Sequence, residues 1–187
     1  MSFAEESGQR TDDLDRLWTP QRLAYVSGEA KPSEGYAKPT DCPFCLTVDD
    51  QGRPSNPLVV ARGERVFAVL NLYPYNPGHL LVCPYRHVPD YTDLDADEAA
   101  EFAAFTQTAM RAVRATSGAH GFNIGMNQGS VAGAGIADHL HQHVVPRWGG
   151  DTNFISVIGR TKVLPQLLED TRDLLAKVWS EQSAGIR

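Results

Sequence analysis

Three histidines alternate with other residues near position 140, and this pattern constrains the fold more than any other feature of the chain. The stretch reads His139-Leu140-His141-Gln142-His143-Val144-Val145 and contains half of the six histidines. Successive side chains of a β-strand point to opposite faces, so a strand over residues 139–146 places all three imidazoles on one face. Leu140 and Val144 then point to the other face, toward a hydrophobic core. The pattern predicts a strand with one face packed and one face available for chemistry.

Three histidines on one face are compatible with a metal site, a histidine nucleophile with supporting imidazoles, or an inert polar strand. Strict alternation inside an apolar stretch argues against the inert strand. Neutral imidazole is a common metal ligand, but the one neighbouring carboxylate, Asp138, is expected to point to the opposite face. The residues by themselves therefore leave metal chemistry and nucleophilic catalysis open.

The remaining hydrophobic patterns predict an α+β fold with an antiparallel sheet. Short apolar stretches at 58–61, 66–72, 80–83 and 121–127 are separated by turn residues and predict strands. Helical spacing predicts one long helix that starts at Asp93 or Asp95 and ends near Thr116, and a second over residues 163–179. The short connections favour an antiparallel sheet over a βαβ repeat. We expect an N-terminal arm and linker over residues 1–40, a catalytic domain over 41–155 and a C-terminal helical extension over 156–187.

Charge and composition exclude several classes of protein. The net charge of −6 argues against a general nucleic-acid binder, which usually has a basic surface. No apolar stretch is long enough to span a bilayer, and the polar start of the chain does not resemble a secretory signal. Three cysteines, an odd number, do not suggest a disulfide framework, and we interpret Cys83 as a core residue. We therefore expect a cytoplasmic protein that binds neither nucleic acid nor membranes.

The histidine stretch resembles the motif of the histidine-triad (HIT) family, in which histidine alternates with mostly apolar residues. Gln142 is the one departure from that pattern. Residues 71–79, Asn-Leu-Tyr-Pro-Tyr-Asn-Pro-Gly-His, resemble the nucleotide-binding segment of the family, and Pro146-Arg147-Trp148 resembles the exit from its histidine strand. Together these segments lie within residues 40–150 and are more specific than the three histidines alone. The resemblance implies a HIT-like sheet with one long helix, a C-terminal helix, and assembly into a homodimer or higher homo-oligomer.

The same resemblance implies roles for four histidines. The middle histidine of the family motif attacks the α-phosphorus, which makes His141 the nucleophile. The backbone carbonyl of His139 accepts a hydrogen bond from Nδ1–H of His141, leaving Nε2 free to attack. His143 and His79 contact the nonbridging oxygens and stabilise the developing charge. The product is a nucleotidyl-histidine intermediate, which water or phosphate then resolves.

Further residues are matched to the substrate by resemblance. Asn71 matches the position that holds the ribose hydroxyls, and Phe67 and Val69 are expected to line the base pocket. Asn127 and the glycine-rich loop from Gly129 to Gly135 resemble the loop over the phosphates, where glycines allow backbone N–H groups to approach an anion.

Gly135 occupies the position, four residues before His139, at which hydrolytic members commonly have glutamine. A small residue opens space for inorganic phosphate, so we favour phosphorolysis of diadenosine tetraphosphate to ADP and ATP. A HIT hydrolase and an adenosine phosphoramidase are alternatives within the same class. A nucleotide-binding regulatory protein is an alternative from another class.

Cys42-Pro43-Phe44-Cys45 has the spacing of a zinc-binding pair, but two thiolates do not complete a tetrahedral site. Some HIT proteins, like the related galactose-1-phosphate uridylyltransferases, add two histidines at positions that match His87 and His139. The resemblance thus implies a structural zinc ion on Cys42, Cys45, His87 and His139, and no organic cofactor. Two reduced cysteines, or a redox pair without the usual βαβ context, are the alternatives.

Overall fold

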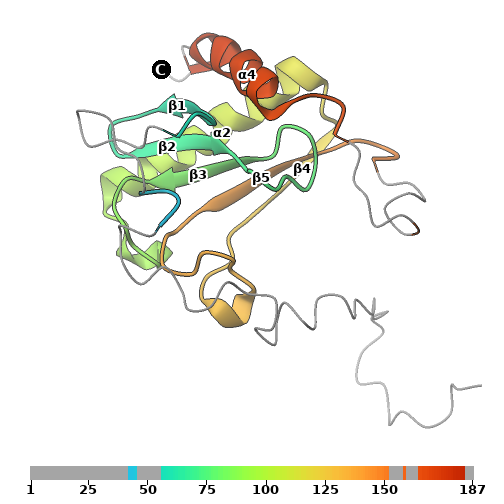
Figure 1. Ribbon diagram of the computed structural model, residues 1–187. Helices are drawn as coiled ribbons and strands as arrows, with labels where there is room; N and C mark the ends of the chain where they lie inside the picture. The colour runs from blue at the N-terminus through green and yellow to red at the C-terminus, as the bar shows by residue number, and fades with distance from the viewer. Residues whose placement is uncertain (1–41, 46–55, 152–157, 159–163, 184–187) are drawn as a thin grey trace, which may run out of the picture. The chain divides into compact units, whose positions relative to one another are not determined.

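The computed structural model describes residues 42–45, 56–151, 158 and 164–183 (Figure 1). In this part of the chain one five-stranded antiparallel sheet has the strand order β1-β2-β3-β5-β4. Its strands are β1 (Val59–Arg62), β2 (Val66–Leu70), β3 (Leu80–Pro84), β4 (Gly121–Gly125) and β5 (Gln142–Arg147). The predicted α+β class with an antiparallel sheet is confirmed. The predicted arm over residues 1–40 lies outside the described residues.

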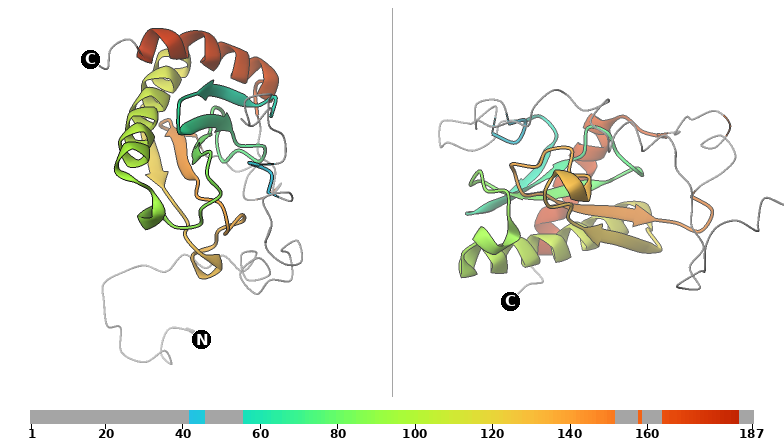
Figure 2. Two further views of the ribbon diagram at one scale, coloured as in Figure 1. Left: turned by 90° about the vertical axis from the view of Figure 1, so that its left-hand side faces the viewer. Right: turned by 90° about the horizontal axis from the view of Figure 1, so that it is seen from below.

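Two helices cover one face of the sheet. Helix α2 (Ala96–Ser117) packs on β2, β3 and β5, and helix α4 (Leu168–Ser183) packs on α2 and β1. Figure 2 shows both helices on one side of the strands and segment 42–45 on the other. The face that the helices leave uncovered is therefore the one available for a functional site. No helix among the described residues is long and apolar enough to cross a membrane.

Local sequence explains where α2 begins and ends. Asp95, one of the two predicted caps, accepts a hydrogen bond from the backbone N–H of Glu98, whose side chain in turn accepts one from the Asp95 N–H. This reciprocal pair satisfies two backbone donors that the first turn leaves without partners. Gly118 ends the helix in the left-handed conformation, with φ of 62°, which glycine adopts without steric cost.

The strand register shows which side chains share a face. Leu81 pairs with His143, Val69 with Leu81, and Phe67 with Cys83. Paired residues point to the same side of a sheet, so Phe67, Val69 and His143 share a face. The alternating residue Gln142 points the other way, where its side-chain amide donates to Thr106 Oγ1 of α2 at 2.9 Å. The helix-free face is therefore the face of His143.

The strand predicted over residues 139–146 is shorter than expected at its start. β5 begins at Gln142, because β3 pairs with it only from Leu80–Val144 to Val82–Gln142. Leu140 instead donates its backbone N–H to the carbonyl of Val88, at 2.7 Å, outside the sheet. His139 and His141 thus lie outside β5, on chain that is hydrogen-bonded to the loop after β3.

Smaller differences affect the other elements. The predicted C-terminal helix over 163–179 is observed as Leu168–Ser183, and residues 159–163 lie outside the described part of the chain. Its buried residues Leu175 and Trp179 belong to the same core as Phe102 of α2. β4 ends at Gly125 rather than at residue 127, and the other strands agree with the prediction to within two residues at each end.

Candidate active site and metal centre

His141 has one ring nitrogen held by the backbone. Its Nδ1 lies 2.8 Å from the carbonyl oxygen of His139, and because a carbonyl only accepts, Nδ1 is the protonated nitrogen. Burial lowers the pKa of His141 below the usual value of a histidine, against the opposing effect of this hydrogen bond. The ring is therefore neutral at physiological pH, and Nε2 has a free lone pair. This is the protonation state that a histidine nucleophile requires.

A chain of hydrogen bonds determines the protonation of two further histidines. The backbone N–H of Tyr75 donates to Nδ1 of His79 at 3.0 Å, so His79 carries its proton on Nε2. Nε2 of His79 lies 2.9 Å from Nδ1 of His143 and donates to it. Nδ1 of His143 is then an acceptor, and its proton lies on Nε2. Burial, followed by the charge of His141, lowers the pKa of His143 to about 4, so this neutral tautomer persists at neutral pH.

His79 differs from the expectation that it contacts the substrate directly. Its side chain is fully buried, and its Nε2 is directed at His143. Asn71, the predicted ribose ligand, places its amide nitrogen 3.3 Å from Nδ1 of His79 and accepts from the Tyr73 N–H. The Asn71–His79 segment thus forms a turn that holds His143 through the hydrogen bond from His79. Tyr75, which the sequence did not single out, fixes the tautomers and stacks on His143 at 5.6 Å.

A cavity of about 480 Å³ opens beside His143 on the helix-free face. The predicted residue Asn127 lines it, together with β4 and β5 residues that include Asn123, Val145 and Arg147. Small-molecule sites are typically about 300–1,000 Å³, so the space is large enough for part of a nucleotide. A cavity of about 540 Å³ lies between α2, α4 and the turn at 148–151, and no histidine lines it. We take the cavity beside His143 as the candidate substrate site.

The other predicted substrate residues lie in two places. Phe67 and Val69 are buried on the same sheet face as His143, and Phe67 stacks on Tyr85 at 5.3 Å. Gly129 and Gly135 are exposed in the loop between β4 and β5, which contains the short helix η2 (Ser130–Ala132). Gly129 has φ of 76°, a conformation that favours glycine.

Cys42, Cys45, His87 and His139 come together as the family resemblance implied. One ligand atom from each residue lies within 4.8 Å of all the others. Nδ1 of His139 is 3.3 Å from both sulfurs, and Nδ1 of His87 is 3.5 Å from Cys45 Sγ. A tetrahedral zinc ion with ordinary Zn–S and Zn–N bonds requires S–N distances of about 3.5 Å. These three S–N distances therefore agree with a tetrahedral zinc site.

The protonation of His139 also suits a metal ligand. Its Nε2 lies 2.9 Å from the carbonyl oxygen of Pro84, so Nε2 carries the proton and Nδ1 has the free lone pair. Burial lowers the pKa of His139 to about 4, which keeps the ring neutral. Between the two cysteines, Phe44 packs against the rings of both His139 and His141, at 5.2 and 5.3 Å. The candidate metal centre and the candidate nucleophile thus both contact Phe44.

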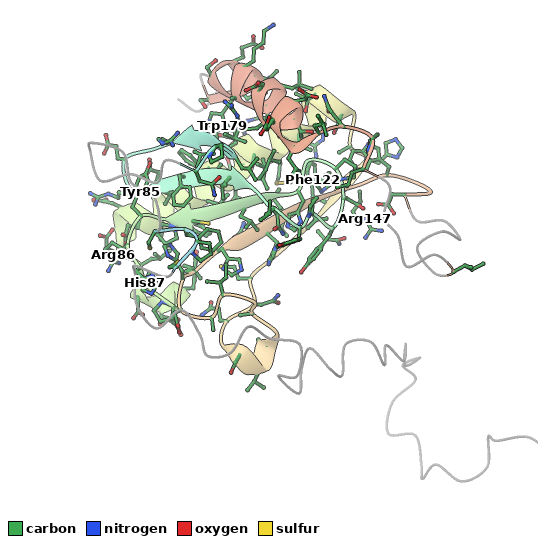
Figure 3. All side chains as sticks on the ribbon, viewed as in Figure 1. Tyr85, Arg86, His87, Phe122, Arg147 and Trp179 are labelled. Atoms are coloured by element: carbon green, nitrogen blue, oxygen red, sulfur yellow. The ribbon has the colours of Figure 1, made fainter. Side chains whose placement is uncertain are left out.

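A polar network that the sequence analysis missed lies at the far end of β5. Arg147 donates to both carboxylate oxygens of Asp151, at 2.6 and 3.0 Å, and this interaction lowers the pKa of Asp151. Buried Asn76 donates to the same carboxylate and to the Pro146 carbonyl. Figure 3 shows Arg147 and His87 at opposite ends of the sheet. The four-residue spacing of Arg147 and Asp151 was the available signal, but on irregular chain it does not predict a contact.

The sequence model of the HIT domain matches residues 54–150. AP-4-A phosphorylase of Mycobacterium tuberculosis strain H37Rv is 54% identical over 186 residues, which cover 96% of this chain and 91% of that protein.

Two solved structures are also similar. A Zn-bound histidine triad family protein from Mycobacterium smegmatis superposes with a TM-score of 0.62 at 29% identity, covering 79% of this chain and 99% of that one. A histidine triad nucleotide-binding protein from Sulfolobus tokodaii gives a TM-score of 0.54 at 29% identity, over 69% of this chain and 85% of the other.

Proposed function

The chain belongs to the HIT domain family, and we propose from this premise that it is an enzyme that cleaves dinucleoside polyphosphates through a histidine nucleophile. We propose diadenosine tetraphosphate as its substrate, in agreement with the name of the M. tuberculosis relative. The observation that most supports the proposal is the bond from Nδ1–H of His141 to the His139 carbonyl. It leaves Nε2 of a neutral ring with a free lone pair, and the centroid of that ring lies 5.2 Å from that of His143, which lines a cavity that fits part of a nucleotide.

In the proposed reaction, Nε2 of His141 forms a bond to the α-phosphorus while the bond from that phosphorus to its bridging oxygen breaks. ATP leaves with the electron pair of that bond, and AMP stays attached to His141. An oxygen of inorganic phosphate then attacks the same phosphorus, which releases ADP and returns the lone pair to Nε2. The exposed small residue Gly135 supports phosphate as the second nucleophile, since it leaves space beside the loop.

His143 is oriented to stabilise the negative charge that develops on the phosphate in this step. Its Nε2–H is available to donate to a nonbridging oxygen, because Nδ1 already accepts from His79. A donor oriented before the reaction stabilises charge that develops in the transition state. We assign His79 a positioning role: it is fully buried and acts by fixing the tautomer of His143. Phe67, Val69, Asn71, Asn127, Gly129 and Gly135 remain the proposed substrate contacts.

We propose that Cys42, Cys45, His87 and His139 hold a structural zinc ion, as the fit of their distances supports. When bound, the ion supplies rigidity rather than a nucleophile, because four protein ligands leave no open coordination position. His139 contributes its side chain to the metal centre and its carbonyl to His141. The ligand cluster therefore positions the nucleophile through the backbone of residue 139.

Assembly and location complete the proposal. We propose a homodimer that acts in the cytoplasm, as the family resemblance suggests. Free cysteines at 42, 45 and 83 agree with a reducing compartment. Light scattering at several protein concentrations tests the dimer.

Incubation with diadenosine tetraphosphate, with and without inorganic phosphate, tests the function. ATP and ADP that form only with phosphate would establish phosphorolysis, whereas ATP and AMP without phosphate would establish a hydrolase. Absence of turnover under both conditions would refute the proposed substrate. Trapping of labelled AMP on the wild-type protein but not on His141→Asn tests the covalent intermediate.

A further inference from the structure

Arg147 lies on the same face of β5 as His143. Side chains alternate along a strand, so His143, Val145 and Arg147 all point to the helix-free side. At about 3.3 Å per residue, the Cα atoms of His143 and Arg147 are about 13 Å apart. Both side chains line the cavity of about 480 Å³. The guanidinium and the candidate catalytic imidazole therefore border one continuous space.

The guanidinium group is held in one orientation by three hydrogen bonds. Nε and Nη2 donate to the two carboxylate oxygens of Asp151, at 2.6 and 3.0 Å, and Nη1 donates to Asn123 Oδ1 at 2.7 Å. Asp151 is itself held by the side chain of Asn76 and the backbone N–H of Trp148. These bonds use three of the five N–H groups of the arginine. Two N–H groups, one on each terminal nitrogen, have no partner among the described residues.

Arg147 is also the one lysine or arginine among the described residues that line this cavity. The other lining residues near it, including Asn123 and Asn127, are neutral and polar. An oriented guanidinium binds phosphate oxygens more strongly than a neutral donor, because the hydrogen bonds are charge-assisted. Its side chain is 46% exposed, so a ligand in the cavity can reach it. Asp151 offsets part of the positive charge but prevents the group from rotating away.

We propose that Arg147 determines specificity for the length of the substrate by binding the phosphates beyond the α-phosphate. This inference rests on the proposed function, since it assigns the phosphorus nearest His141 and His143 as the α-phosphorus. The nucleoside monophosphate that becomes attached to His141 does not reach Arg147, whereas the leaving triphosphate portion does. A merely structural role, in which Arg147 only ties the turn at residues 148–151 to β5, predicts no such dependence on phosphate number.

The experiment compares equilibrium binding of ATP and AMP by calorimetry for the wild type, Arg147→Met and a control, Arg65→Met. Methionine keeps the apolar stem of the side chain and removes the donors. Arg65 is similarly exposed and pairs with Asp97 at 3.2 Å, at the N-terminus of α2. In a second variant, Arg147→Met with Asp151→Asn, no carboxylate is left without its cation. Its folding is therefore less sensitive to the loss of the arginine.

We expect Arg147→Met and the double variant to weaken ATP binding by about tenfold or more, the usual effect of losing charge-assisted hydrogen bonds. AMP binding should change by less than about twofold, and Arg65→Met should change neither. Equal weakening of ATP and AMP, or no weakening of ATP, would overturn the inference. Wild-type protein that binds ATP no more tightly than AMP would overturn it as well. Turnover of diadenosine tetraphosphate by the wild type tests the proposed function separately, so the two failures are distinguishable.

Discussion

Gln142 is the one polar residue at an apolar position of the histidine motif, and its partner on α2 allows a quantitative prediction. Its side chain is 8% exposed, and Nε2 donates to Thr106 Oγ1 at 2.9 Å. Thr106 uses the same hydroxyl to donate to the Phe102 carbonyl, at 2.9 Å. The two residues are therefore not equivalent: Thr106 keeps a partner when Gln142 is replaced, whereas Gln142 loses this partner when Thr106 is replaced.

This asymmetry sets the expected free energies of unfolding. Thr106→Val leaves the Gln142 amide unpaired, which costs about 1–3 kcal/mol for a buried group. Because Thr106 is only partly buried, we expect about 1–2 kcal/mol, in the lower part of that range. Gln142→Leu loses one hydrogen bond but buries more apolar surface, so its net effect should lie within about 1 kcal/mol of zero. In the double variant no amide is left unpaired, and its stability should return to within about 1 kcal/mol of the wild type.

Thermal and urea unfolding of the zinc-saturated proteins measures these differences. For a chain of this length, about 1–2 kcal/mol corresponds to a decrease in Tm of about 2–8 °C for Thr106→Val. Turnover should be unchanged in all three variants, because both side chains point to the helix layer. A double variant at least as unstable as Thr106→Val would refute the argument, since it would show that the unpaired amide is not the source of the loss.

Three further predictions concern the site. His141→Asn should abolish turnover and keep zinc at the wild-type stoichiometry, and loss of zinc from that variant would favour a metalloenzyme centred on the histidine strand. Cys45→Ser should lower the zinc content measured by elemental analysis and lower Tm by several degrees, since a structural ion contributes to folding free energy; an unchanged zinc content would remove Cys45 from the proposed site. The pKa of His143 is lowered to about 4 from an unfolded value near 6.5, so protonation favours the unfolded chain as pH falls from 6.5 to 4. His143→Asn should reduce the slope of the unfolding free energy against pH in that window by at most about 1.4 kcal/mol per pH unit, and the partial exposure of His143 lowers this limit. An unchanged slope would contradict the lowered pKa of His143.

Sequence reasoning was most successful where periodicity and local chemistry agree. Helical spacing predicted α2, whose buried residues include Phe102, Ala109 and Val113, and the predicted residue Asp95 caps its N-terminus. The four proposed zinc ligands came from the family resemblance rather than from spacing, because His87 and His139 are distant from the cysteines in sequence. Their close approach depends on the loop after β3, which no local pattern predicts.

The remaining differences arise from tertiary contacts. Alternation alone predicted a strand through His139. Leu140 instead bonds to Val88 outside the sheet, so pairing with β3 begins only at Gln142. Motif matching placed His79 against the substrate, whereas burial and the Tyr75 amide direct it to His143. Motif matching gave Arg147 only as part of the exit from the histidine strand, and the register of β5 assigns its side chain to the cavity. In each case the deciding partner is distant in sequence or is a backbone group.

The acceptor that orients His141 belongs to the main chain of residue 139, and this has a consequence for how such proteins diverge. Every amino acid has a carbonyl, so substitution of the His139 imidazole does not remove the group that fixes the His141 tautomer. In the proposed site, the zinc ligand and the acceptor that orients His141 are therefore two different groups of one residue. A lineage that loses Cys42 and Cys45 can also lose the imidazole at 139, provided that packing holds the backbone in place. His141 has no such freedom, because its proposed role as nucleophile depends on the side chain itself.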